Sequence, residues 1–174
     1  MKQVASAQRE VTASQSKKNQ SEFVALYDAA RKNGLAPHVL VPPCDDYEKI
    51  VSSPDDLDAM LEIIARLSAS EAETLLAEAA PEPIVVYGGA MHNDLLPRAG
   101  HEKWSFGPEL DKRTSHRYVE LDLIVPEMIQ DTEAWRAQPW YAHYDRRAQG
   151  GKTILFHVRP GSYALVFPVG FTLL

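Results

Sequence analysis

A short β-branched run that stops at two glycines most constrains how this chain can fold. Residues 84–86 are Ile-Val-Val, and Gly88 and Gly89 follow after one tyrosine. Such a run is typical of a buried strand in an α/β sheet, and glycine lets the backbone turn sharply where the strand ends. Open α/β sheets place their ligand crevices at this edge. His92 and Asp94, which follow within five residues of Gly89, are therefore expected to lie where a ligand would bind.

Composition narrows the class of protein. The formal net charge of −6 argues against a nucleic-acid partner, because phosphate-binding surfaces normally carry a basic excess. Cys44 is the single cysteine, and its acidic neighbours favour a structural thiol. No apolar run reaches the roughly 18 residues of a membrane helix, and the N-terminus lacks the apolar region of a signal peptide. We therefore expect a cytoplasmic protein as encoded, or an exported one if the chain is a fragment of a longer precursor.

The first half of the chain predicts helices. Residues 1–20 are polar with little periodicity, so they are expected to form a flexible N-terminal arm. Residues 21–174 are expected to form a single α/β domain. Within it, residues 22–33 place apolar side chains on one face of a helix that an Asn-Gly pair caps. Two further helices are expected to begin at capping sequences, one at Ser53 and one at Ser70.

The second half predicts a sheet. Residues 117–125 alternate strictly, with one face formed by Val119, Leu121, Leu123 and Val125 and the other by Tyr118, Glu120, Asp122 and Ile124. A helix is expected over 126–136, and a tight turn between 153–158 and 163–167 predicts a β-hairpin. With the strand at 84–87, these elements predict an α/β fold: a mixed β-sheet flanked by helices, with a C-terminal β-hairpin.

A known family shares the motif at the end of the first predicted strand. Gly89-Ala-Met-His92 fits the pattern Gly-x-x-His. In this setting it resembles the ChaN-like haem-binding uptake family, which serves iron uptake, and its relatives, the TraB/Tiki proteins and the erythromycin esterases. The resemblance covers about residues 51–167. It implies an α/β protein that gathers a histidine and glutamates near the strand ends to bind a divalent metal or haem, or to activate water in hydrolase-like chemistry. Gly89 and His92 are the residues onto which the motif carries over.

One part of that family's pattern has no counterpart here. Its acidic motif lies on an early strand, whereas residues 1–50 contain only Glu10, Glu22 and Glu48, in an arm or in helical surroundings. The chain is therefore interpreted as the C-terminal half of such a domain, and so as an incomplete one. Because an incomplete sheet leaves an edge or a face uncovered, we expect a homodimer or a partner chain that completes the sheet.

His92, Asp94 and Glu120 are the candidate metal ligands, with Asp94 able to orient the imidazole of His92. Each has a structural alternative. His92 could be a loop histidine bonded to the backbone, and Asp94 the cap of a short turn. Glu120 and Asp122 could form a carboxylate pair or lie on a solvated sheet face. His101, in a glycine-containing loop, could close over the same edge or lie on the surface.

The loop at 138–150 combines aromatic residues with two arginines. It could hold haem, with a tyrosine (Tyr141 or Tyr144) or His143 as the axial ligand and Arg146 and Arg147 on the propionates, or it could pack against the sheet. Zinc-peptidase, Walker and α/β-hydrolase motifs are absent. Two hypotheses therefore remain, between which enzymatic activity stays open: a metal- or haem-associated domain, and a non-catalytic binding or structural module that has lost the acidic half of its site.

Overall fold

The structure is a computed structural model that describes residues 17–52, 57–78 and 83–170. It divides the chain into two compact units, residues 1–63 and 64–174, and each is described by itself. Of the arm predicted at 1–20, residues 17–20 belong to a helix and the rest lies outside the described residues. None of the described helices is long and apolar enough to cross a membrane.

The first unit is helical. It contains α2 (Lys17–Lys32) and α3 (Cys44–Ser52), and the boundary with the second unit falls within α4 (Leu57–Glu78). The predicted cap of α2 is confirmed, because Gly34 has a φ of 79° and the backbone N–H of Leu35 donates to the carbonyl of Ala30. The capping sequence at Ser53 lies outside the described residues.

The prediction of a new helix at Ser70 is wrong. α4 continues through this position without a break, and the Thr74 hydroxyl donates to the Ser70 carbonyl within the helix. Neither glycine nor proline occurs between the ends of α4, and its alanines, leucines and glutamates favour helix throughout. This intrinsic preference outweighs a capping pattern that is equally compatible with a helix interior.

The strand predicted at 84–87 is also wrong. Residues 83–89 form neither strand nor helix, and Val85 is 80% exposed. Ile84 and Val86 are partly buried, and Val86 packs against a small core of Ala69, Ala72, Phe106 and Leu110. A strand needs a neighbour for its backbone N–H and C=O groups, and none of the described strands pairs with this segment. Its β-branched composition alone does not make it part of the sheet.

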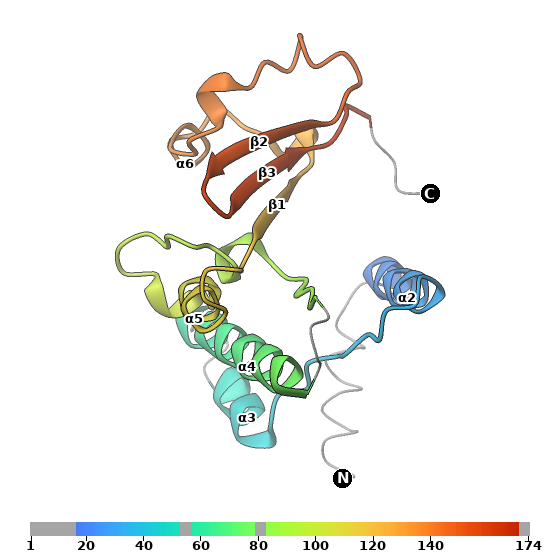
Figure 1. The fold of residues 1–174 in the computed structure, drawn as a ribbon, viewed down its shortest axis with the longest axis vertical. Coiled ribbons are helices and arrows are strands. Elements are labelled where there is room, and N and C mark those ends of the chain that lie inside the picture. The colour runs from blue at the N-terminus through green and yellow to red at the C-terminus, as the bar shows by residue number, and fades with distance from the viewer. Residues whose placement is uncertain (1–16, 53–56, 79–82, 171–174) are drawn as a thin grey trace. The chain divides into compact units, whose positions relative to one another are not determined.

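A three-stranded mixed sheet organises the second unit (Figure 1). Its strands are β1 (Glu120–Ile124), β2 (Ile154–Arg159) and β3 (Ser162–Val166), in the order β1-β3-β2. β2 and β3 form the predicted antiparallel hairpin, and β1 runs parallel to β3. The α/β fold with a mixed sheet and a C-terminal hairpin is thus confirmed.

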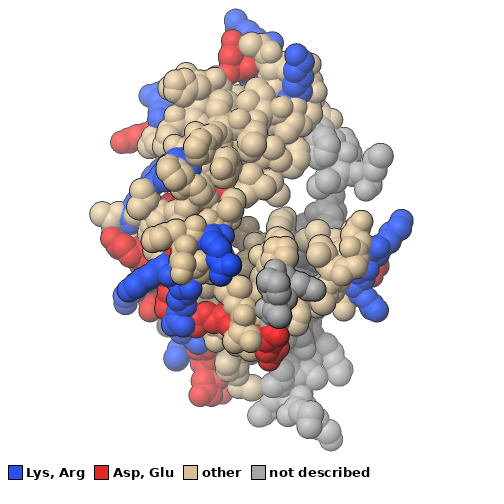
Figure 2. Space-filling view, in the orientation of Figure 1, with Lys and Arg blue, Asp and Glu red and all other residues tan. Residues whose placement is uncertain are grey.

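The two faces of this sheet differ sharply in burial. On one face, Ala164 and Val166 are fully buried beneath Trp140, with Ile124 and Phe156 packed beside them. The opposite face carries Leu121, Leu123 and Leu155, all of which are exposed. The surface over the strands that is turned to the viewer in Figure 2 is mostly free of charged side chains. The strict alternation predicted for β1 is present, and its apolar face is the exposed one.

Short helices and loops connect these elements. The segment before β1 contains the 3-10 helices η1 (Ala90–His92) and η2 (Glu102–Trp104) and the helix α5 (Gly107–Arg113). Between β1 and β2 lie η3 (Pro126–Met128), α6 (Glu133–Arg136) and η4 (Tyr141–His143). The helix predicted over 126–136 is therefore wrong as one element: two short helices stand there, separated by residues 129–132.

Candidate ligand-binding pocket

The Gly-x-x-His segment forms a single hydrogen-bonded 3-10 turn. The backbone N–H of His92 donates to the carbonyl of Gly89 at 2.9 Å, which closes η1. The imidazole is 6% exposed, and its Nδ1 lies 2.8 Å from the carbonyl oxygen of Trp104. Because a carbonyl only accepts, Nδ1 carries the hydrogen of this bond. His92 therefore makes the backbone contact that its structural alternative predicts, and it joins η1 to the end of η2.

Ser105 and Gly107 fasten the following loop. The Ser105 hydroxyl lies 2.7 Å from the carbonyl of Asp94, and the backbone N–H of Gly107 donates to that hydroxyl at 3.1 Å. A Cβ at position 107 would lie 2.6 Å from the carbonyl oxygen of Asn93 and 2.7 Å from that of Asp94. Only glycine allows this close approach, so the start of α5 fixes the backbone that carries Asp94.

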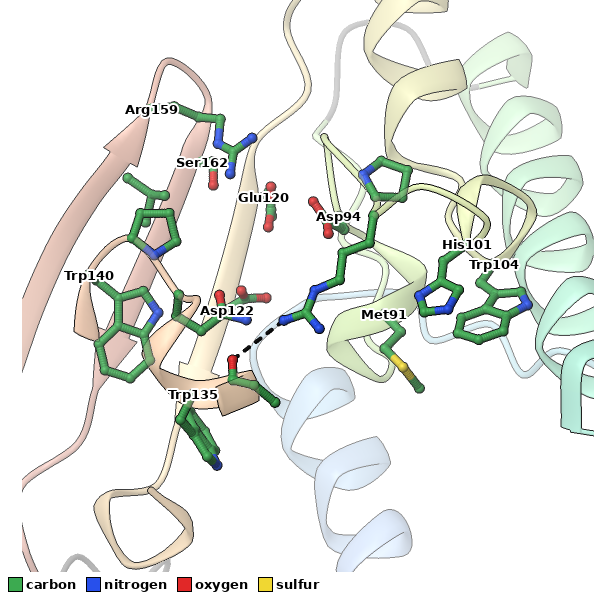
Figure 3. A pocket seen from close by; sticks show the side chains of 16 residues that line it. Met91, Asp94, His101, Trp104, Glu120, Asp122, Trp135, Trp140, Arg159 and Ser162 are labelled. Carbon is green, nitrogen blue, oxygen red and sulfur yellow. Dashed lines mark hydrogen bonds between the residues drawn. The ribbon is translucent and has the colours of Figure 1, made fainter. Parts of the chain in front are cut away.

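A pocket of about 350 Å³ opens beside this loop, entirely within the second unit (Figure 3). Its walls come from four segments: residues 91–104, β1, the 134–140 region and the ends of β2 and β3. Asp94 and Glu120 both line it, whereas His92 does not. The structure thus brings Asp94 and Glu120 together in this pocket. It places the third candidate metal ligand, His92, outside the pocket, against the carbonyl of Trp104.

Glu120 and Asp122 face the pocket from the covered side of β1. Glu120 is buried, and its Oε2 accepts the backbone N–H of Leu95 at 3.1 Å. Burial raises the pKa of Glu120, with a smaller contribution from the charge of Asp122, while the Leu95 N–H acts in the opposite direction. Burial also raises the pKa of Asp122, whose Oδ1 lies 3.4 Å from the side-chain nitrogen of Asn93. Of the two alternatives for these residues, the solvated face does not apply, because this side of β1 is covered.

Asp94 caps a turn and lines the pocket at the same time. Its Oδ1 accepts the backbone N–H of Leu96 at 2.8 Å, which fixes the side chain in the turn. The carboxylates of Asp94 and Glu120 point toward one another across the cavity, with Asp122 beside them (Figure 3). Three acidic side chains from two separate segments therefore share one cavity.

Two arginines line the same pocket. Arg98 donates to the carbonyl of Ala134 at 3.4 Å, and Arg159 lies half-buried at the end of β2. Among the residues that the structure describes, neither guanidinium lies within 4.0 Å of a carboxylate, although Asp94, Glu120 and Asp122 line the same cavity. The pocket thus holds charges of both signs that do not neutralise one another in direct pairs.

Aromatic rings form part of the wall. His101 stacks on Trp104, with centroids 3.8 Å apart and an interplanar angle of 15°. Across the pocket, Trp135 meets Trp140 edge to face at 5.9 Å. The loop residue His101 therefore lines this pocket, stacked on Trp104.

The aromatic loop at 138–150 packs against the sheet. Trp140 is 4% exposed and stacks on Phe156 at 5.7 Å. The Tyr144 hydroxyl lies 3.0 Å from Oε1 of Gln149, while Arg146 and Arg147 are exposed. These contacts match the packing alternative for the loop. Arg159 and Trp135 were not among the sequence candidates. The only signal in the sequence that pointed to Arg159 is its charge beside the hairpin turn.

In the described part of the chain, no group of three His, Cys, Asp or Glu side chains could hold a metal ion. No family model matches the chain, and neither the curated proteins nor the solved structures contain a match. The ChaN-like resemblance, and the binding of a metal or haem that it implies, stay predictions from the motif.

Proposed function

We propose that residues 64–174 are a ligand-binding module of ChaN-like descent whose pocket binds a small ligand that carries a positive charge. One observation carries this proposal. Asp94, Glu120 and Asp122 line one cavity, and among the described residues no Lys, Arg or His nitrogen lies within 4.0 Å of their carboxylate oxygens. A protonated amine would supply a positive charge there, and a divalent metal is the alternative that the Gly-x-x-His motif implies. The module binds, and no catalytic step is required of it.

The electrostatics of the pocket support this proposal. Removing a carboxylate from water without a partner disfavours its charged form, and burial raises the pKa of both Glu120 and Asp122. A bound cation would compensate for this loss of hydration. Carboxyl groups whose pKa is perturbed by burial in a cleft are a recognised mark of functional sites.

Binding of a panel of cations tests the proposal. The purified chain is titrated by calorimetry with Mg²⁺, Ca²⁺, Mn²⁺, Zn²⁺, haem and phenethylamine. We expect at least one cation to bind, and Asp122→Asn to weaken it about tenfold or more, because a charged partner is lost. Glu78→Gln, at the exposed end of α4, is the matched control and should bind like the wild type. If no probe binds, or if Asp122→Asn binds as tightly as the wild type, the pocket is not the site.

A change at His92 separates the pocket from the motif. His92→Ala removes the bond to the Trp104 carbonyl and leaves a cavity, so we expect a loss of about 1–3 kcal/mol in the free energy of unfolding. Cation affinity of the folded protein should be unchanged. The opposite result, intact stability with metal or haem binding abolished, would place the site at the imidazole, as the Gly-x-x-His motif implies.

The exposed face of the sheet supports a second proposal, on assembly. Leu121, Leu123 and Leu155 form an apolar surface on one side of the sheet, and such surfaces recruit partners. We propose that a second copy of the chain covers this face. The mass of the protein in solution tests this proposal.

A further inference from the structure

We infer that the ligand of this pocket is a zwitterion of the amino-acid class, with its ammonium group at Asp94, Glu120 and Asp122 and its carboxylate at Arg159. The inference rests on the proposed function, which supplies the positive charge, and adds the second, negative group. It depends on how Arg159 is presented, on the space between the two charged ends and on the chemistry of a guanidinium.

An irregularity in β2 turns Arg159 toward the cavity. The pairing of β2 with β3 shifts between His157 and Arg159, so that Arg159 lies opposite Ser162. In a regular strand, consecutive side chains point to opposite faces, yet Val158 and Arg159 both line the pocket. A bulge of this kind redirects a side chain, and bulges are over-represented beside functional sites. The structure thus departs from regular pairing at the residue that brings a cation to the pocket.

The guanidinium of Arg159 is available for a ligand. Among the residues that the structure describes, it has neither a carboxylate within 4.0 Å nor a hydrogen-bond acceptor, whereas Arg98 already donates to Ala134. A guanidinium presents parallel N–H groups that match the two oxygens of a carboxylate. Figure 3 shows Arg159 beside Ser162 at one end of the cavity, with Asp94 and Glu120 facing one another nearby.

The remaining walls suit a ligand with an apolar side chain. Met91, Trp135 and Val158 line the pocket around the charged groups. Its volume of about 350 Å³ lies at the small end of the range for pockets that bind small molecules. A metal ion or a simple amine would leave Arg159 unused, while an amino acid with a large apolar side chain uses both charged ends and the apolar wall.

Three compounds that differ in one group each test the inference. L-phenylalanine carries both charges, phenethylamine lacks the carboxylate, and 3-phenylpropanoate lacks the ammonium group. By calorimetry near neutral pH, we expect L-phenylalanine to bind about tenfold or more tightly than either analogue. Arg159→Gln should weaken the binding of L-phenylalanine by a similar factor and leave the affinity for phenethylamine unchanged. Arg147→Gln, an exposed arginine outside the pocket, is the control.

The outcomes separate this inference from the proposed function. If phenethylamine binds as tightly as L-phenylalanine, or if Arg159→Gln affects neither, the ligand is a simple cation and the inference is overturned. If Mn²⁺ binds and none of the common L-amino acids does, the inference is likewise overturned while the proposed function stands. Circular dichroism of each variant confirms that a loss of binding is not a loss of the fold.

Discussion

The two faces of β1 reverse the usual polarity of a half-buried strand. Its carboxylates, Glu120 and Asp122, lie on the covered face, and its leucines, Leu121 and Leu123, lie on the exposed one. A strand with one solvated face normally turns its apolar residues inward. What covers the inner face is the aromatic loop around Trp140, which packs on β2 and β3. The orientation of β1 is therefore set by its neighbours, and it leaves Glu120 buried and Asp122 half-buried in spite of the favourable hydration of a carboxylate.

Truncating one side chain on each face gives the largest expected contrast. Trp140→Ala removes a ring that is 4% exposed and should lower the free energy of unfolding by about 3–5 kcal/mol. Leu123→Ala removes a side chain that is 48% exposed and should cost no more than about 0.5 kcal/mol. Urea denaturation measures both. A cost for Leu123→Ala in the range of a buried leucine, about 2–5 kcal/mol, would show that the leucine face is covered.

A smaller effect should appear when the buried charge is removed. Because the pKa of Glu120 is raised in the folded protein, the folded state holds the proton more tightly than the unfolded state. Its contribution to stability is complete below about pH 4 and is lost as the pH rises through the raised pKa, at about 1.4 kcal/mol for each unit of difference. Glu120→Gln keeps an acceptor for the Leu95 N–H and should remove this loss.

Urea denaturation of the wild type and Glu120→Gln between about pH 4 and 8 measures that difference, which should grow in favour of the variant as the pH rises. Glu78→Gln, which removes an exposed carboxylate at the end of α4, is the control for the loss of one negative charge. Equal pH dependence in wild type and Glu120→Gln would mean that the carboxylate is solvated, and the contrast between the faces would disappear.

The smallest effect on stability is expected from a charge on the leucine face. Leu123→Lys should leave the free energy of unfolding within about 0.5 kcal/mol, because the side chain is exposed. If this face binds a second copy, the same change should convert a dimer to a monomer in sedimentation velocity at about 100 μM. A wild-type chain that sediments as a monomer at this concentration would contradict self-association through the face.

Local signals in the sequence predicted the parts of the fold that depend on neighbours along the chain. The hairpin of β2 and β3 follows from a short turn between two apolar runs, and the alternation in β1 is as the sequence indicated. The strand at 84–87 was predicted from composition, but strand formation depends on a partner elsewhere in the chain, which periodicity does not reveal. The helix start at Ser70 was wrong because capping residues are also accepted inside a helix.

The positions of the candidate site residues also depend partly on local signals and partly on distant contacts. Asp94 and Glu120 line one pocket. The sequence indicated both the loop after Gly89 that carries Asp94 and the strand face that carries Glu120. The place of His92 depends on a bond to Trp104, twelve residues away, which no motif specifies. Arg159 reaches the pocket only through a bulge, and alternation counted from the sequence assigns it to the other face.

A substitution at Gly107 can change the pocket from outside it. Any side chain at this position must displace the carbonyls of Asn93 and Asp94, which lie less than 3 Å from where its Cβ would be. The displaced backbone carries one of the pocket's carboxylates, although residue 107 itself does not line the pocket. In a library of random variants, substitutions here should therefore appear among those with altered ligand preference, and a search confined to residues in contact with the ligand would overlook them.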